Sequence, residues 1–287
     1  MEFNFSDADM SAMIQEMENE KNKNTFVSPY WKPANEGSYN LRFITPLKQF
    51  GEKVFYQKHR MHYINNRAYF CLNQTLKDKN GNIHEAEECP ICKKVQQLYR
   101  LYEKGSEETK IASSIAAKDR FVSRVIVRGN KTADNQPCEF KPEFYEFGKK
   151  IHEYFFNVTN SGDAGNWISL KEGRDYILSK KGTGRNTDYS GSMLSMKQSP
   201  IFTDTEDLKK LLEYLPKMEY SQLVSFVTAD EMSKALNDFF SEESKEVDMP
   251  APAPIQDIDP MSGGLNPTVD NSSSTGDSDI DQLLGMI

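Results

Sequence analysis

The sequence has no apolar run that approaches the roughly eighteen residues of a membrane-spanning helix. Its first twenty residues are acidic and lack the basic and then apolar segments of a signal peptide. Cysteine is also scarce, with four in 287 residues, which excludes the disulfide framework of small secreted domains. These absences predict a soluble, intracellular protein of a reducing compartment.

The chain also lacks the residue patterns of an enzyme. It has four histidines, and no Ser/His/Asp arrangement, catalytic carboxylate pair or nucleotide-binding fingerprint is apparent. The glycine-rich stretch at 182–191 lacks the Gly-Lys-Ser/Thr ending and the following helix of a phosphate-binding loop. We therefore expect a protein without catalytic activity.

Charge is abundant but segregated along the chain. Residues 1–20 carry six acidic side chains and no basic one, whereas residues 21–200 carry 30 lysines and arginines against 19 acids. Residues 201–287 are again acidic, with 18 acids against five bases. The net charge of −8 therefore hides a positive body between negative ends, which is typical of a domain that binds a polyanion. Acidic ends that only increase solubility are the alternative.

Local patterns divide the chain into four parts. Residues 1–24 form an acidic arm with a short amphipathic helix for self-association or partner contact, and residues 25–203 form the body. In the body, a helix begins near Pro90 and ends before Gly105. Runs of β-branched and aromatic residues predict strands at 39–44, 54–64, 68–72, 121–128, 143–147 and 174–181. The fold class is therefore mostly β with interposed helices, arranged as a partly open barrel or sandwich.

The C-terminal parts have a different character. Residues 204–240 are predicted to be helical, with Asp204 as the N-cap and a break at Pro216, and to pack on the core. Residues 241–287 contain ten acids, one lysine and no aromatic residue, so they cannot bury enough apolar surface to become ordered. We expect a disordered acidic tail whose tip, DSDIDQLLGMI, has the pattern of a docking peptide for protein partners.

Most of the potential metal ligands fall between residues 59 and 92. Cys89 and Cys92 have the CxxC spacing by which two thiolates share one tetrahedral ion, and Cys71 supplies a third ligand. Three cysteines and one histidine close the coordination shell, which is typical of one structural Zn²⁺ ion and not of a catalytic one. Redox chemistry of the CxxC pair is the alternative. The candidates for the fourth ligand are His59, His62 and His84.

The geometry of a predicted hairpin discriminates between these histidines. If its turn consists of two residues, for which Asn65-Asn66 is suited, His62 lies on the same face as Cys71. A three-residue loop would instead place His59, and not His62, on the same face as Cys71. This assignment by alternating faces is the parity argument. His84, in the loop that follows, is the third choice. The predicted zinc subdomain covers approximately residues 55–105.

Three stretches of the positive body interleave bases with rings. Alternation along 118–128 sends the bases to one exposed face and the apolar residues to the core. Residues 143–150 combine rings with two lysines, and residues 178–189 carry bases and a tyrosine on a glycine-rich loop. Bases that follow phosphates beside rings that stack on unpaired bases are typical of a single-strand binder. The candidate contacts with single-stranded DNA are Lys118, Arg120, Phe121, Arg124, Tyr145, Phe147, Lys149, Lys150, Lys180, Lys181, Arg185 and Tyr189.

Taken together, these motifs resemble a known family. The His and Cys hairpin, the Cys-Pro-Ile-Cys turn, the basic strand, FGKKI at 147–151 and the tail tip resemble the single-stranded DNA-binding, helix-destabilising proteins of T4-like bacteriophages. The resemblance implies an OB-like core and a basic, ring-lined cleft for single-stranded DNA. It also implies one structural zinc ion on His62, Cys71, Cys89 and Cys92.

The function that the resemblance implies is the coating and protection of single-stranded DNA during phage replication, recombination and repair. The protein would act in the cytoplasm of the infected bacterium. Its acidic tail would recruit replication and recombination proteins such as a polymerase, a helicase loader and a recombinase. The alternative function is that of a zinc-containing RNA-binding or transcription-associated protein.

The chain departs from this family in two places. Arg120-Phe121 stands where the family has Tyr-Trp, and Arg185 stands where the family has a ring. The two expectations at these places are weaker stacking on the bases or guanidinium stacking in place of ring stacking. The family binds the neighbouring protomer with a basic N-terminal arm, but here the arm is acidic and Lys21 and Lys23 are the nearest bases. Self-association along DNA is therefore an open expectation.

Overall fold

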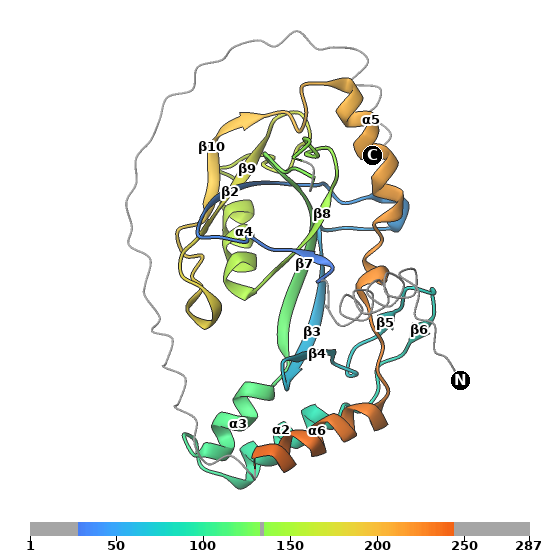
Figure 1. The fold of residues 1–287 in the computed structure, drawn as a ribbon, viewed down its shortest axis with the longest axis vertical. Coiled ribbons are helices and arrows are strands. Elements are labelled where there is room, and N and C mark those ends of the chain that lie inside the picture. Colours follow the sequence, from blue (N-terminus) through green and yellow to red (C-terminus); the bar gives the residue numbers. More distant parts are fainter. Residues whose placement is uncertain (1–27, 133–134, 244–287) are drawn as a thin grey trace, which may run out of the picture.

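The longest strand, β7 (Lys118–Val127), comes from the segment in which bases and apolar residues alternate. Strand β8 (Glu143–Phe147) pairs with one edge of β7. The other edge is shared, because β3 (Tyr56–Ile64) pairs with the first half of β7 and β2 (Gly37–Phe43) with its second half. This strand therefore connects two regions of the molecule, as Figure 1 shows.

The structure is a computed structural model that describes residues 28–132 and 135–243. The predicted N-terminal arm, and the predicted acidic tail apart from residues 241–243, therefore lie outside the described residues. Within them, no helix combines the length and the apolar character that crossing a membrane requires.

The remaining strands extend the sheet on both sides of β7. Strand β9 (Gly173–Lys180) pairs with β2, and β10 (Met193–Ser199) pairs with β9. On the other side, β1 (Tyr30–Trp31) runs parallel to β8. The order β1-β8-β7-β2-β9-β10 leaves β1 and β10 as edges, so the sheet is open. The predicted mostly β fold with interposed helices is confirmed, with an open sheet instead of a closed barrel.

Two short hairpins and five helices complete the described fold. Strand β4 (Arg67–Phe70) pairs with β3, and β5 (Leu76–Lys77) pairs with β6 (Ile83–His84). Figure 1 places three helices together beyond the far end of β3 and β7, whereas α4 lies beside the sheet. The helices are α2 (Pro90–Leu101), α3 (Glu107–Ile115), α4 (Lys149–Ser161), α5 (Thr205–Tyr214) and α6 (Ala229–Glu243).

The second half of β7 borders a core that is rich in rings, which we name the aromatic region. Phe43 lies edge to face with Phe155, with ring centroids 4.8 Å apart, and Phe155 stacks on Trp167 at 4.8 Å. Such ring pairs stabilise a core beyond the apolar area that they bury. The buried members of the aromatic region are Leu41, Phe43, Phe121, Val125, Val127, Tyr145, Phe147, Phe155, Trp167, Tyr176, Leu178 and Leu194.

The first half of β7 leads to a second core, which we name the metal region. It is formed by the β3–β4 hairpin, α2, α3 and α6, and its buried apolar members are aliphatic residues, one methionine and cysteines. Helix α6 packs here, whereas α5 packs on a separate cluster that includes Ile44 and Ile126, so the predicted helical part 204–240 packs on the core at two places. The buried members are Ile64, Cys71, Leu72, Cys89, Ile91, Val95, Leu98, Ala112, Ile115, Met232 and Leu236.

Several local predictions are confirmed and others are incomplete. Asp204 caps α5 by accepting a hydrogen bond from the Glu206 N–H, and a 3₁₀ turn at Leu215–Lys217 interrupts the helices at Pro216. Helices α3 and α4 and strand β10 were not predicted. Helix α4 nevertheless has a helical signal, because Ile151, Tyr154, Phe155 and Val158 recur at helical spacing and pack on the aromatic region.

Candidate metal centre and nucleic-acid interface

The β3–β4 hairpin positions the histidine that faces the cysteines. Asn65 and Asn66 form its two-residue turn with φ of 47° and 60°, so the predicted turn is confirmed. Asparagine tolerates this left-handed conformation better than most residues. With this turn, His62 pairs with Tyr69 in the ladder and the Cys71 N–H donates to the Arg60 carbonyl. His62 and Cys71 therefore share one face of the hairpin.

The other two cysteines come from the start of helix α2. Cys89 is its N-cap residue and Pro90 occupies the first position, where its missing N–H costs no helical hydrogen bond. Cys92 lies in the first turn, so both sulfurs point toward the hairpin. The ligand atoms of His62, Cys71, Cys89 and Cys92 all lie within 4.8 Å of one another.

The distances between these atoms fit a tetrahedral ion. Metal–sulfur bonds of about 2.3 Å and a metal–nitrogen bond of about 2.0 Å place tetrahedral ligands roughly 3.5–3.8 Å apart. The His62 Nε2 atom lies 3.4 Å from the Cys89 Sγ and 3.5 Å from the Cys92 Sγ. The Sγ atoms of Cys71 and Cys92 are 3.5 Å apart. This donor set can hold one metal ion and is compatible with a structural zinc ion.

A carbonyl of α3 orients the His62 ring. The Nδ1 atom lies 2.8 Å from the Ile115 carbonyl oxygen, so Nδ1 carries the proton that it donates and Nε2 keeps its lone pair for the ion. Hydrogen bonds from the thiols of Cys71 and Cys92 lower the pKa of Cys89, which favours the thiolate that a metal requires. Sequence reasoning missed Ile115, although Ser106 at the start of α3 is a recognisable N-cap.

The alternative histidines lie elsewhere. His59 is buried beside the Phe70 ring on the opposite face of the hairpin, and burial lowers its pKa to about 4. His84 bonds to Asp78 and stacks on Phe226. Neither belongs to the ligand cluster. The parity argument therefore identified the histidine that lies with the three cysteines in one cluster.

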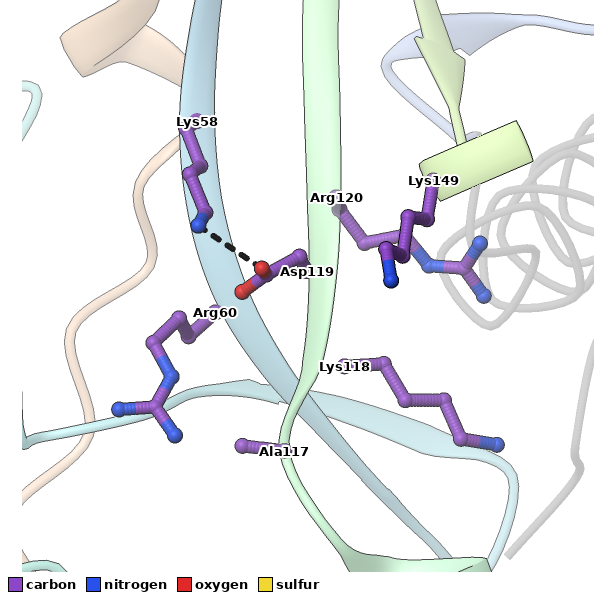
Figure 2. A pocket seen from close by; sticks show the side chains of 7 residues that line it. All are labelled: Lys58, Arg60, Ala117, Lys118, Asp119, Arg120 and Lys149. Atoms are coloured by element: carbon purple, nitrogen blue, oxygen red, sulfur yellow. Dashed lines mark ion pairs between the residues drawn. The ribbon is translucent and has the colours of Figure 1, made fainter. Parts of the chain in front are cut away.

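A basic cleft of about 720 Å³ lies where β3, β7 and the start of α4 meet. Figure 2 shows Lys118, Arg120 and Lys149 on one side of β7, with Lys58 and Arg60 beside β3 on the other. One carboxylate is present, and it forms a 2.8 Å ion pair with Lys58. The full lining is Lys58, Arg60, Ala117, Lys118, Asp119, Arg120 and Lys149.

Three of the predicted contacts with DNA, Lys118, Arg120 and Lys149, line this cleft, and Lys150 follows as an exposed residue of α4. Lys58 and Arg60 were missed. The sequence holds one signal for them, because Lys58 and Arg60 are two residues apart and so lie on the same face of β3. In the sheet, Arg60 lies opposite Asp119 of β7 and Lys58 opposite Phe121. Only the pairing of β3 with β7, which are far apart in the sequence, brings the basic residues of the two strands together.

The expectation that Arg124 lies on an exposed face is wrong. Its side chain is 2% exposed and forms a bidentate ion pair with Glu52, with distances of 2.7 and 2.9 Å. Its Nε also donates to the Met218 carbonyl, and the Tyr220 ring covers the guanidinium. Alternation along β7 failed here because other elements cover both faces of its second half.

The rings Phe121, Tyr145 and Phe147 lie in the core. Each is less than 5% exposed and belongs to the aromatic region. Phe121 also stacks on the His152 ring at 3.9 Å. These rings pack in the core against the sheet, so they are not exposed for stacking on a nucleobase.

The remaining predicted contacts lie on the connection from β9 to β10. Lys180 donates to the carbonyls of Pro33 and Ala34, and Lys181 is exposed. Tyr189 is half-buried against the aromatic region. Arg185 lies in a 3₁₀ turn, Gly184–Asn186. Lys180, Lys181 and Tyr189 do not belong to the lining of the basic cleft.

Comparison with known proteins bears on both sites. A family model described as gp32 DNA binding protein like matches residues 35–239, which include the metal ligands and the basic cleft. Among curated proteins, no match to the chain is found.

Proposed function

Because the chain belongs to the gp32-like family of DNA-binding proteins, we propose that it binds single-stranded DNA without strong sequence preference. It would coat and protect strands exposed during phage DNA replication, recombination and repair, in the cytoplasm of the infected bacterium. It would carry out no catalytic step.

The basic cleft is the observation that supports this proposal most strongly. Five lysines and arginines meet one carboxylate in it, and that carboxylate is already paired with Lys58. A cleft with one sign of charge attracts a phosphate backbone without reading its bases. Its cations lie along two strands and at the start of one helix, an arrangement that follows a flexible backbone better than it fits a major groove.

A titration with poly-dT at several salt concentrations tests the proposal. Each neutralised phosphate of a single strand contributes about −0.7 to the slope of log K against log salt, so we expect affinity to fall steeply. Arg60→Glu should weaken binding, whereas the matched variant Lys210→Glu, in an ion pair on α5 outside the cleft, should not. A flat salt dependence would contradict the cleft as the binding site.

Competition between DNA and RNA single strands of equal length separates this function from the alternative. A DNA-binding function predicts that RNA competes poorly at equal concentration. RNA that displaces the DNA instead would favour the RNA-binding alternative, because the 2′-hydroxyl would then be read.

We assign one structural zinc ion to His62, Cys71, Cys89 and Cys92. When bound, the ion supplies no chemistry of its own and joins the β3–β4 hairpin to the start of α2. Metal analysis of the purified protein should find one zinc per chain. An absorption spectrum of the cobalt-substituted protein should show four protein ligands and no water.

The two acidic ends of the chain complete the proposal. Residues 241–287, with their ten acids, would recruit replication and recombination proteins and compete with DNA for the basic cleft. Deletion of this tail should tighten the binding of poly-dT. Unchanged or weaker binding would contradict the competition. The acidic arm 1–24 would serve self-association along DNA, which a comparison of binding cooperativity with and without the arm would test.

A further inference from the structure

Arg120 is held at one position in the basic cleft by a residue of the neighbouring hairpin. Its Nε donates a 2.9 Å hydrogen bond to the Tyr63 hydroxyl, and its guanidinium carbon lies 5.3 Å from the centre of the Tyr63 ring. Tyr63 belongs to β3 and Arg120 to β7, so the contact spans 57 residues of sequence. A single bond of this kind fixes the direction of an otherwise flexible side chain.

The other edge of the guanidinium is available. Within the described part of the chain, no further hydrogen bond and no ion pair of the Arg120 side chain is present. Gly148, just before α4, leaves room for it, since a Cβ there would lie 3.3 Å from the Arg120 Nη1. Figure 2 shows Arg120 beside Lys149 on the side of β7 to which Lys118 also points. The two terminal amino groups therefore face a space that is flanked by cations.

The partner of Arg120 is neutral, which preserves its charge for a ligand. A tyrosine hydroxyl is uncharged at neutral pH, so this hydrogen bond does not neutralise the guanidinium. Among the ion pairs of the described residues, none joins Glu146 of β8 to Arg120, and burial raises the pKa of Glu146. Arg124, four residues along the same strand, differs because its guanidinium is neutralised by Glu52 in the core.

From this geometry we propose that Tyr63 is a positioning residue that holds Arg120 ready to bind a phosphate of the DNA strand. The inference rests on the proposed function and adds to it the residue that orients one contact. Arginine binds phosphate through two parallel N–H groups, and this fork is most effective when its direction is fixed before the ligand arrives. Tyr63 would touch the arginine and not the DNA.

The test is a double-mutant cycle with a labelled dT oligonucleotide. Tyr63→Phe keeps the ring and removes the hydroxyl, and we expect affinity to fall roughly five-fold with an unchanged thermal midpoint. Arg120→Ala should reduce affinity roughly ten-fold and make the salt slope shallower by about 0.7, the loss of one phosphate contact. Tyr63→Phe in the Arg120→Ala background should have no further effect.

Two further variants add a steric test and a control to the double-mutant cycle. Gly148→Ala places a methyl group against the guanidinium and should weaken binding slightly, roughly two-fold. Tyr99→Phe removes a hydroxyl from an exposed tyrosine of α2 outside the cleft and should leave affinity unchanged.

An equal loss from Tyr63→Phe in both backgrounds, or no loss in the wild-type background, would overturn the positioning role while leaving the proposed function intact. Failure of the unmodified protein to bind the oligonucleotide would instead overturn the proposed function, and the positioning role with it. The two failures are therefore distinguishable in one set of titrations.

Discussion

The aromatic region and the metal region, at the two ends of β7, are stabilised by different means. The aromatic region has seven buried rings in mutual contact, among them Phe43, Phe155 and Trp167. Among the described residues, the metal region has no phenylalanine, tyrosine or tryptophan in its buried core and includes the cysteines of the cluster that could hold a metal ion. Small subdomains that bury too little apolar surface can be stabilised by a bound ion. One strand therefore joins a core of packed rings to a core with a cluster that could hold a metal ion.

The basic cleft lies between these regions and depends on both. Lys149 begins α4, which packs on the aromatic region through Phe155. Lys58 and Arg60 lie on β3, which continues directly into the ligand His62. The cations of the cleft therefore come from a helix that packs on the aromatic region and from the two strands that reach the metal region.

Removal of a metal ligand should have the largest effect. We expect Cys89→Ser to abolish zinc binding and to unfold the metal region, because the ion contributes most of the stability of such a subdomain. Zinc content and limited proteolysis measure this change, while Trp167 fluorescence reports that the aromatic region persists. His59→Ala is the control and should retain zinc. A Cys89→Ser protein with one zinc per chain would refute the ligand assignment.

The converse experiment removes a ring from the aromatic region. Phe155→Ala should lower the free energy of unfolding by about 3–5 kcal/mol, because the ring is buried against Phe43 and Trp167. Its zinc stoichiometry should stay at one. The matched variant Phe156→Ala changes the next residue of the same helix, which is 62% exposed, and should cost little. Loss of zinc in the first variant would show that the regions are not separable.

Acid should destabilise the end of β3 near the metal region through His59. Burial lowers the pKa of His59 to about 4, whereas the unfolded chain has a value of about 6.5. The fold therefore prefers neutral His59, so its contribution is complete above pH 6.5 and is lost as the pH falls toward 4. The loss amounts to roughly 3 kcal/mol at most.

Urea unfolding at pH 7.5, 6 and 5 measures this loss. His59→Phe keeps a ring beside Phe70 and should show a shallower decline with pH than the unmodified protein. Identical declines in the two proteins would rule out a contribution from His59.

The smallest effect is expected in the basic cleft, between the two regions. Asp119→Asn removes the one carboxylate of the basic cleft and frees Lys58, so affinity for single-stranded DNA should rise roughly two-fold. Stability should change by less than about 1 kcal/mol, because the ion pair is exposed. Asp207→Asn breaks a similar pair with Lys210 on α5 and should leave affinity unchanged. Equal binding by both variants would argue against the cleft.

The parts of the molecule that follow from local rules were predictable. The Asn65-Asn66 turn sets the parity of its hairpin, and that parity selects His62 over His59. Asp204 and Pro216 mark the ends of their helices by side-chain capping and a missing N–H. Helix α4 was predictable in principle but was missed, because its aromatic residues have high strand propensity as well.

The sequence by itself determined the segregation of charge, the cysteines and histidine that CxxC spacing and hairpin parity bring into one cluster, and the mostly β fold. These depend on spacing over short distances. Only the tertiary structure decided which arginine side chains keep a charge that is available to a ligand. Arg120 and Arg124 have the same place in the alternation of β7, yet Tyr63 leaves the charge of Arg120 available and Glu52 neutralises that of Arg124. The physical reason is that burial and ion pairing depend on partners 57 and 72 residues away, which no local pattern specifies.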